Sequence, residues 1–221
     1  MNMDLNHLLP FLALIAIPAV LGLVFYLTQK RRKEVEQMAL SCGLTLDPDA
    51  AGLPELGNEG MELFKRGHSR KYRNLIPSYG AGAEKVYFFD YSYVTGGGRH
   101  HSTHKFTAAC FEFSQPIFPA FTLGPENFMD KLADMLGFPD IDIDGFPAFS
   151  KQYKLTGLDK SAVLAFFGPQ TVNFFEQNPG WRVQASGRRI VVFKNEGFMP
   201  ASAYQAYMEE TKNLVSSIAK E

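Results

Sequence analysis

The chain has 221 residues, 46% of them hydrophobic and 20% charged, which is typical of an ordered globular protein and excludes an intrinsically disordered one. Without Asp4 and the four basic residues at positions 30–33, its 22 Lys and Arg fall to 18 and its 23 Asp and Glu to 22, so the remaining chain has a net charge of −4. A mildly acidic domain is a poor binder of nucleic acid, so we expect no nucleic-acid partner.

The first predicted element is a transmembrane helix over Leu8–Leu27, in the stretch LLPFLALIAIPAVLGLVFYL. Its uncharged residues, at about 1.5 Å each, span about 30 Å, which is the thickness of the hydrocarbon core of a bilayer. A cleaved signal peptide is the alternative, but no Lys or Arg precedes the stretch and no A-x-A cleavage site closes it. The sequence therefore predicts a single membrane anchor within residues 1–29.

Four basic residues follow this segment directly: Lys30, Arg31, Arg32 and Lys33. Because basic residues mark the cytoplasmic end of a membrane helix, we expect the N-terminus outside and the C-terminal domain in the cytoplasm, at the inner membrane of a bacterium. The helix is expected to continue past these residues and to stop at Gly43.

The domain organisation follows from these elements. Residues 30–54 are expected to form a juxtamembrane helix and a linker, and residues 55–221 a cytoplasmic domain, in which a division into 55–124 and 125–221 stays open. The two cysteines, Cys42 and Cys110, form no C-x-x-C motif and suit a reducing compartment.

After a short helix near GMELFKRG, the segment from Arg70 to Ser114 is expected to be β structure. Two runs of alternating side chains, VYFFDYSYV and THKFTAACFEF, flank a glycine-rich loop and so predict an antiparallel hairpin. The favoured register places Val94 opposite Thr103 and Asp90 opposite Thr107, which gives one aromatic face and one polar face. A polar face should be open to solvent.

Helices and a second hairpin make up the rest of the chain. The sequence predicts helices over 125–137, 159–168, 169–177 and from 201 to the end, and a hairpin around Ser186 and Gly187. The motif FPAF occurs at 118–121 and at 146–149, either as an internal repeat or as two unrelated proline turns. The fold class is therefore α+β, a mainly antiparallel sheet of β-hairpins with several packed helices.

The loop TGGGRHHSTHK holds three histidines: His100, His101 and His104. In a strand, His100 and His104 would lie about 13 Å apart, too far to share one metal ion. No Cys, Asp or Glu lies in the loop to complete a zinc site. We therefore favour an exposed hairpin tip and no metal, and a metal site that uses all three histidines is the alternative.

Two other motifs contain side chains that could form a catalytic or a metal site. Asp90, Ser92 and His104 have the side chains of a hydrolase triad, but the register puts His104 on the opposite face. We expect Asp90 to form a surface ion pair with Lys105 instead. The stretch DIDIDG at 140–145 matches the start of a calcium-binding EF-hand loop, but its twelfth position is Lys instead of Glu, so a strand with one solvated face is favoured.

A second basic cluster lies in KRGHSRKYR. Near a membrane it could bind anionic headgroups, whereas its alternative is a charged edge strand that resists aggregation. The candidates for headgroup contact are Lys30, Arg31, Arg32, Lys33, Lys65, Arg66, Arg70, Lys71 and Arg73.

The apolar anchor, the stretch FDYSYVTGGG and the two FPAF motifs resemble a group of uncharacterised bacterial single-pass membrane-anchored proteins. The resemblance implies the same architecture and, since no activity is assigned to that group, transfers no site. With no coherent catalytic set, we expect a membrane-tethered protein-interaction module without a cofactor, such as an accessory or assembly subunit that binds another membrane or cytoplasmic protein. The alternative is a membrane-bound, metal-dependent hydrolase that uses the histidine loop.

Overall fold

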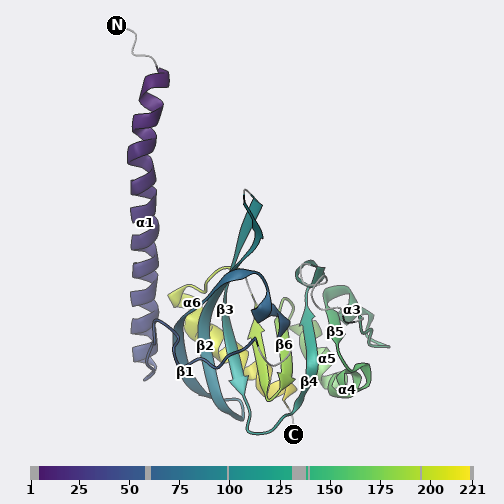
Figure 1. The fold of residues 1–221 in the computed structure, drawn as a ribbon. Coiled ribbons are helices and arrows are strands. Elements are labelled where there is room, and N and C mark those ends of the chain that lie inside the picture. The colour runs from purple at the N-terminus through teal and green to yellow at the C-terminus, as the bar shows by residue number, and fades with distance from the viewer. Residues whose placement is uncertain are drawn as a thin grey trace.

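The computed structural model describes residues 5–57, 61–98, 100–130, 138, 140–194 and 196–219, and for residues 5–13 and 15 the backbone alone. Its helices and strands follow one another in mixed order, without a regular β-α-β pattern (Figure 1). The helices are α1 (Leu5–Ser41), η1 (Glu62–Lys65, a 3-10 turn), α3 (Pro147–Gln152), α4 (Lys160–Phe166), α5 (Pro169–Gln177) and α6 (Ala201–Ile218). The strands are β1 (His68–Gly80), β2 (Ala83–Gly97), β3 (His100–Glu112), β4 (Phe118–Gly124), β5 (Lys154–Gly157), β6 (Arg182–Gly187) and β7 (Arg189–Phe193).

The strands form one seven-stranded sheet in the order β1-β2-β3-β7-β6-β4-β5, and every neighbouring pair is antiparallel. The predicted α+β class with a mainly antiparallel sheet is confirmed. Strand β3 pairs with β7, and β4 pairs with both β5 and β6. Strands from 55–124 and from 125–221 therefore interleave within one sheet.

The register predicted for the first hairpin is confirmed, because Val94 lies opposite Thr103 and Asp90 opposite Thr107. The prediction of a solvated polar face is wrong. Phe88 and Asp90, on that face, are buried, and Phe88 packs against Tyr207 of α6, which crosses behind the sheet in Figure 1. Both faces of the central strands are thus covered, one by α6 and the other by the segment that contains η1.

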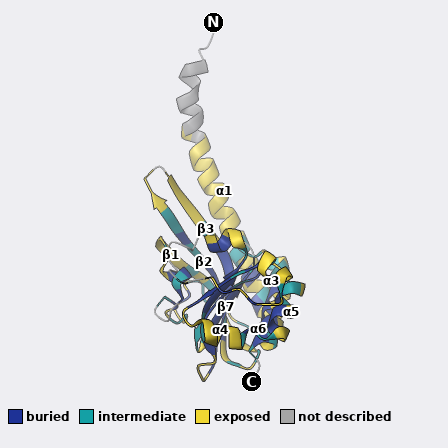
Figure 2. Cartoon of the chain, turned by 90° about the vertical axis from the view of Figure 1, so that its right-hand side faces the viewer, coloured by how far each residue is buried: buried dark blue, intermediate teal, exposed yellow. Residues whose placement is uncertain are grey.

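Helix α1 has two parts with different surroundings. Its C-terminal part packs on the domain through Val35 and Ala39, which are fully buried, and it ends as predicted before Gly43, whose φ of 70° is a left-handed cap. Its N-terminal part extends away from the domain (Figures 1 and 2). At Leu14 and from residue 16 to Leu27, its apolar side chains are exposed on all sides of the helix, among them Leu21 at 63% and Phe25 at 65%.

This exposed part overlaps the predicted membrane span. The side chains of residues 8–13 and 15 lie outside the described residues. Within the described part of the chain, no helix combines the length and the apolarity of a membrane span. Membrane anchoring therefore stays a prediction.

Several local predictions are confirmed. Asp159 caps α4 by accepting hydrogen bonds from the backbone N–H groups of Ser161 and Ala162, at 2.9 and 3.1 Å. The hairpin around Ser186 and Gly187 is β6–β7. The C-terminal helix buries the predicted stripe, which consists of Tyr204, Met208, Thr211, Val215 and Ile218.

Other segments differ from the predictions. The first FPAF lies inside β4 and the second begins α3, so the two copies have different secondary structures. In the segment 140–145 the alternation of burial is confirmed, but regular pairing is confined to an isolated bridge at Asp140. Residues 126–130 are helical, whereas residues 131–137 of the helix predicted there lie outside the described part.

Candidate functional site

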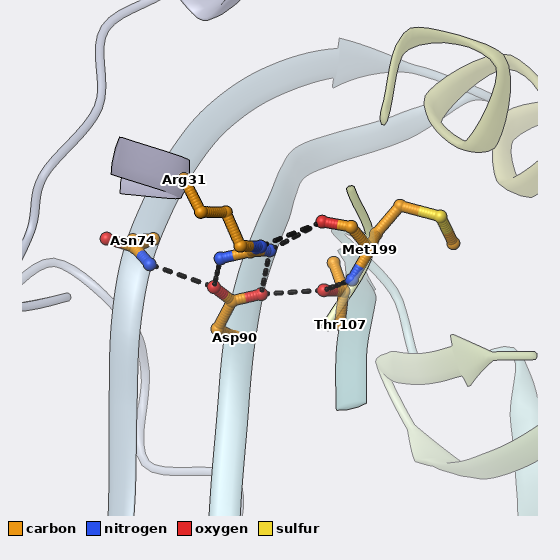
Figure 3. A network of polar contacts seen from close by, with 5 residues as sticks. All are labelled: Arg31, Asn74, Asp90, Thr107 and Met199. Atoms are coloured by element: carbon orange, nitrogen blue, oxygen red, sulfur yellow. Dashed lines mark hydrogen bonds and ion pairs between the residues drawn. The ribbon is translucent and has the colours of Figure 1, made fainter. Parts of the chain in front are cut away.

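The site is a polar network at the foot of the projecting part of α1, where Arg31 enters the domain (Figure 3). Its guanidinium group donates to both carboxylate oxygens of Asp90 on β2, at 2.6 and 3.1 Å. The same group donates from Nε and from a terminal nitrogen to the carbonyl oxygen of Met199, at 3.0 and 2.7 Å. One side chain thus connects α1, the sheet and the segment before α6.

Asp90 is a buried and fully bonded carboxylate, with 1% of its surface exposed. Besides Arg31, it accepts hydrogen bonds from the side chains of Asn74, at 2.8 Å, and Thr107, at 2.6 Å. A carboxylate has about four acceptor positions, and all of them are used here. All the acceptor positions of Asp90 are therefore occupied by other side chains of the same protein.

The expected surface ion pair between Asp90 and Lys105 is wrong. Lys105 lies opposite Ser92 in the register, and its Nζ lies 5.8 Å from the ring centroid of Phe198. The charge of Asp90 is instead balanced by Arg31, 59 positions away in the chain. A buried carboxylate needs such a partner because desolvation of an unpaired charge costs several kcal/mol.

A bulge in β1 brings Asn74 to the carboxylate. The register of β1 on β2 shifts between Arg73 and Ile76, and Asn74 has a φ of 53°. Asn is among the few residues that adopt this left-handed conformation readily. The left-handed backbone thus turns the Asn74 amide toward Asp90, whereas regular strand geometry would direct it elsewhere.

The segment between β7 and α6 closes the network from the other side. Its Met199 backbone N–H donates to the hydroxyl of Thr107, at 2.9 Å, while the ring of Phe198 lies 5.1 Å from the guanidinium carbon of Arg31. Gly197 donates from its backbone N–H to the carbonyl oxygen of Lys105, at 2.6 Å. Stacking on the aromatic ring leaves the guanidinium edge available for hydrogen bonds.

Two tyrosines of α6 lie near Asp90. Burial raises the pKa of Tyr204 and Tyr207 well above the usual value, and the negative charge of Asp90 raises it further. The Tyr207 hydroxyl donates to the carbonyl oxygens of Thr107 and Val192, at 3.0 and 3.2 Å. Both phenols stay neutral, so the charges of the network are those of Arg31 and Asp90.

A cavity of about 330 Å³ lies next to the network. Four cationic side chains and two carboxylates line it, together with uncharged side chains at the exposed part of α1. The cations are those of Arg31, Arg32, Arg73 and Lys105, and the carboxylates those of Asp49 and Asp90.

The predicted headgroup candidates thus separate into two groups. Arg31, Arg32 and Arg73 meet at the cavity, and Lys105, which was not among the predicted candidates, lines it as well. The others lie elsewhere. The Nζ atom of Lys30 lies 4.0 Å from a carboxylate oxygen of Glu34, and that of Lys65 lies 2.7 Å from one of Glu62. Arg66 lies over the ring of Tyr93, and Arg70 donates to the carbonyl oxygens of Phe64 and Lys65. Lys33 and Lys71 are exposed.

The three loop histidines do not form one group. His104 stacks on Tyr93, with ring centroids 4.7 Å apart, and its Nε2 lies 2.8 Å from the hydroxyl of Thr95. His100 and His101 are exposed at the end of the hairpin, opposite Gly97 and Gly96. Among the residues that the structure describes, no three metal-binding side chains come together. Tyr93 lies opposite His104 in the register. Asp90 and Ser92 lie on the other face of β2, so the three residues of the imagined hydrolase triad do not share a face, as predicted.

Comparisons with models of known protein families, with characterised proteins and with solved structures give no match to this chain.

Proposed function

We propose that the protein is a membrane-tethered interaction module, which α1 anchors in a bilayer and which contacts another protein of the same membrane. The observation that carries this proposal is the exposed apolar surface of α1 between Leu14 and Leu27. A helix that is apolar on all sides is stable where lipid or protein covers it. The basic residues 30–33 support an orientation with the domain on the cytoplasmic side of that membrane.

The network around Arg31 supports the tether. Since Arg31 fixes the foot of the projecting helix to β2 and to Met199, the domain and the anchor are joined through side-chain contacts as well as through the chain. Such a junction would hold the domain at one height and orientation against the bilayer.

The end of the β2–β3 hairpin supports the contact with a partner. It rises beyond the sheet on the side toward which α1 projects (Figures 1 and 2). Its residues 96–98 and 100–103 are exposed. A two-stranded ribbon that extends into solvent is marginally stable alone and gains from packing on another surface. A protein in the same membrane would meet the anchor and the hairpin together.

Photo-crosslinking in native membranes tests the proposal. A photoreactive amino acid at Ser102, on the hairpin, should give a discrete adduct with a second protein. The matched control is the same amino acid at Lys160, an exposed residue of α4, which should give none. If Ser102 gives no more adduct than Lys160, and the protein extracted in mild detergent is a monomer without a partner, the proposal fails.

A further inference from the structure

We propose that the cavity at the foot of α1 binds a phosphate group of an anionic ligand, and that a membrane phospholipid supplies it. The choice of lipid as the source rests on the membrane anchoring proposed above. The assignment of a phosphate group rests on the side chains of the cavity alone.

The charge of the cavity favours an anion. Four cations against two carboxylates leave an excess of two positive charges, in a domain that is acidic as a whole. Asp90 is already neutralised by Arg31. The cationic groups of Arg32, Arg73 and Lys105 have no carboxylate partner among the described residues and so can bind a ligand.

The types of side chain favour phosphate in particular. The planar guanidinium groups of Arg32 and Arg73 can each donate two parallel hydrogen bonds to phosphate oxygens, and the ammonium group of Lys105 adds a point charge. These three come from α1, β1 and β3, so folding gathers them from distant parts of the chain. The volume of about 330 Å³ lies in the range of pockets for small ligands.

The apolar lining connects this pocket to the proposed bilayer. Val24 and Leu27, at the end of the exposed apolar part of α1, line the same cavity and are 56% and 51% exposed. Phe198 adds an aromatic ring. A phospholipid has the matching chemistry, because its charged phosphate and its apolar chains meet at the boundary between headgroup and hydrocarbon.

Two matched double variants test the proposal. Arg32→Gln with Arg73→Gln removes one charge from α1 and one from β1 inside the cavity, whereas Lys33→Gln with Lys71→Gln removes one from each element outside it. The full chain is purified in mild detergent, and binding of phosphatidylglycerol is titrated by native mass spectrometry. Circular dichroism of each variant checks that it is folded.

We expect the cavity variant to bind phosphatidylglycerol at least roughly tenfold more weakly than the unaltered chain. The control should lose less than about threefold, because Lys33 and Lys71 do not line the cavity and act on a bound phosphate only through solvent. Phosphatidylcholine, whose headgroup has no net charge, should bind much more weakly. Equal losses in both variants, or equal binding of the two lipids, would overturn the proposal.

Inorganic phosphate distinguishes the two sources of the phosphate group. Weak competition by inorganic phosphate supports the lipid, whereas competition at equal concentration supports a phosphate site that a soluble ligand fills and overturns the lipid as its source. Because the titration is done in detergent, its result does not depend on whether α1 spans a bilayer. If the crosslinking experiment at Ser102 failed, the proposal of a phosphate site in the cavity would likewise be unaffected.

Discussion

At the scale of single residues, the ion pair of Arg31 and Asp90 decides how α1 meets the domain. Removal of Arg31 leaves a carboxylate that is 1% exposed with two neutral donors, Asn74 and Thr107. Loss of one partner of a buried pair costs about 3–5 kcal/mol, and the value here should be smaller because 20% of the Arg31 side chain is exposed.

We therefore predict that Arg31→Ala lowers the free energy of unfolding of the full chain by about 2–3 kcal/mol. Urea unfolding in detergent, followed by tyrosine and tryptophan fluorescence, measures it. The neighbouring exposed residue gives the control, since Lys33→Ala should change the value by less than about 0.5 kcal/mol. A cost for Arg31→Ala as small as that of Lys33→Ala would show that the pair does not hold the helix.

Glu112 makes stability depend on pH at the other end of β3. It accepts hydrogen bonds from Arg188 and Arg189, at 2.5 and 3.3 Å. Burial raises the pKa of Glu112, but the hydrogen bonds and charges of Arg189 and Arg188 outweigh this and lower it below the ordinary value. A lowered pKa in the folded state stabilises the protein above the pKa of an unfolded glutamate, and this contribution is lost as the pH falls through the folded-state pKa.

The unfolding free energy should accordingly fall more steeply with acid in the unaltered chain than in Glu112→Gln, over the range from about pH 5 to pH 3. Above this range the two curves should run parallel, with the variant less stable. Chemical unfolding at a series of pH values gives both curves. Identical slopes in acid would mean that the two arginines do not act on this carboxylate.

At the scale of elements, the hairpin end depends on the close approach of Gly96 to the opposite strand. Gly96 has a φ of 79°, and a Cβ there would overlap the carbonyl oxygen of His100, whereas a Cβ at Gly97 would meet nothing within 4 Å. We predict that Gly96→Ala opens the end of the hairpin and that Gly97→Ala does not. Amide hydrogen exchange should become faster at residues 95–103 in the first variant alone. Equal exchange in both would contradict this geometry.

The elements differ in how far the sequence predicts them. The register of β2 and β3 follows from alternating side chains on both sides of a glycine loop, which is a local pattern. The same pattern could not show that α6 covers the face with Asp90, because that contact joins residues about a hundred positions apart. Pairing of β3 with β7 likewise joins residues that are far apart in the chain, such as Ala109 and Val192.

The candidate site shows the same limit. Local sequence patterns predict a lipid contact for Arg31 and a surface position for Asp90, since no local pattern joins residues that are 59 positions apart. One signal was present: Asp90 is the single charge within the aromatic stretch YFFDYSY, and a charge in a strand that is buried on both faces requires a counter-ion. Lys105 was missed as a cavity residue because only the fold brings it near Arg32.

At the scale of the whole molecule, the exposed part of α1 and the end of the β2–β3 hairpin project from the same side of the domain (Figures 1 and 2). The ion pair of Arg31 and Asp90 and the cavity beside it lie at the foot of this part of α1. The domain itself does not cover the apolar side chains of this part of α1. A bilayer on that side would cover the helix, bring headgroups to the cavity and place the hairpin at its surface. The central claim is therefore that the exposed part of α1 lies in lipid.

Spin-label accessibility in reconstituted vesicles tests this claim most directly. With Cys42 replaced by Ser, labels are attached to Leu21→Cys in the apolar part of α1 and to Glu36→Cys beside the domain, both of which are exposed positions. We predict that the label at position 21 is relaxed by oxygen and protected from a water-soluble nickel chelate, and that the label at position 36 shows the reverse. Equal access of the nickel chelate to both labels would contradict a membrane-inserted helix.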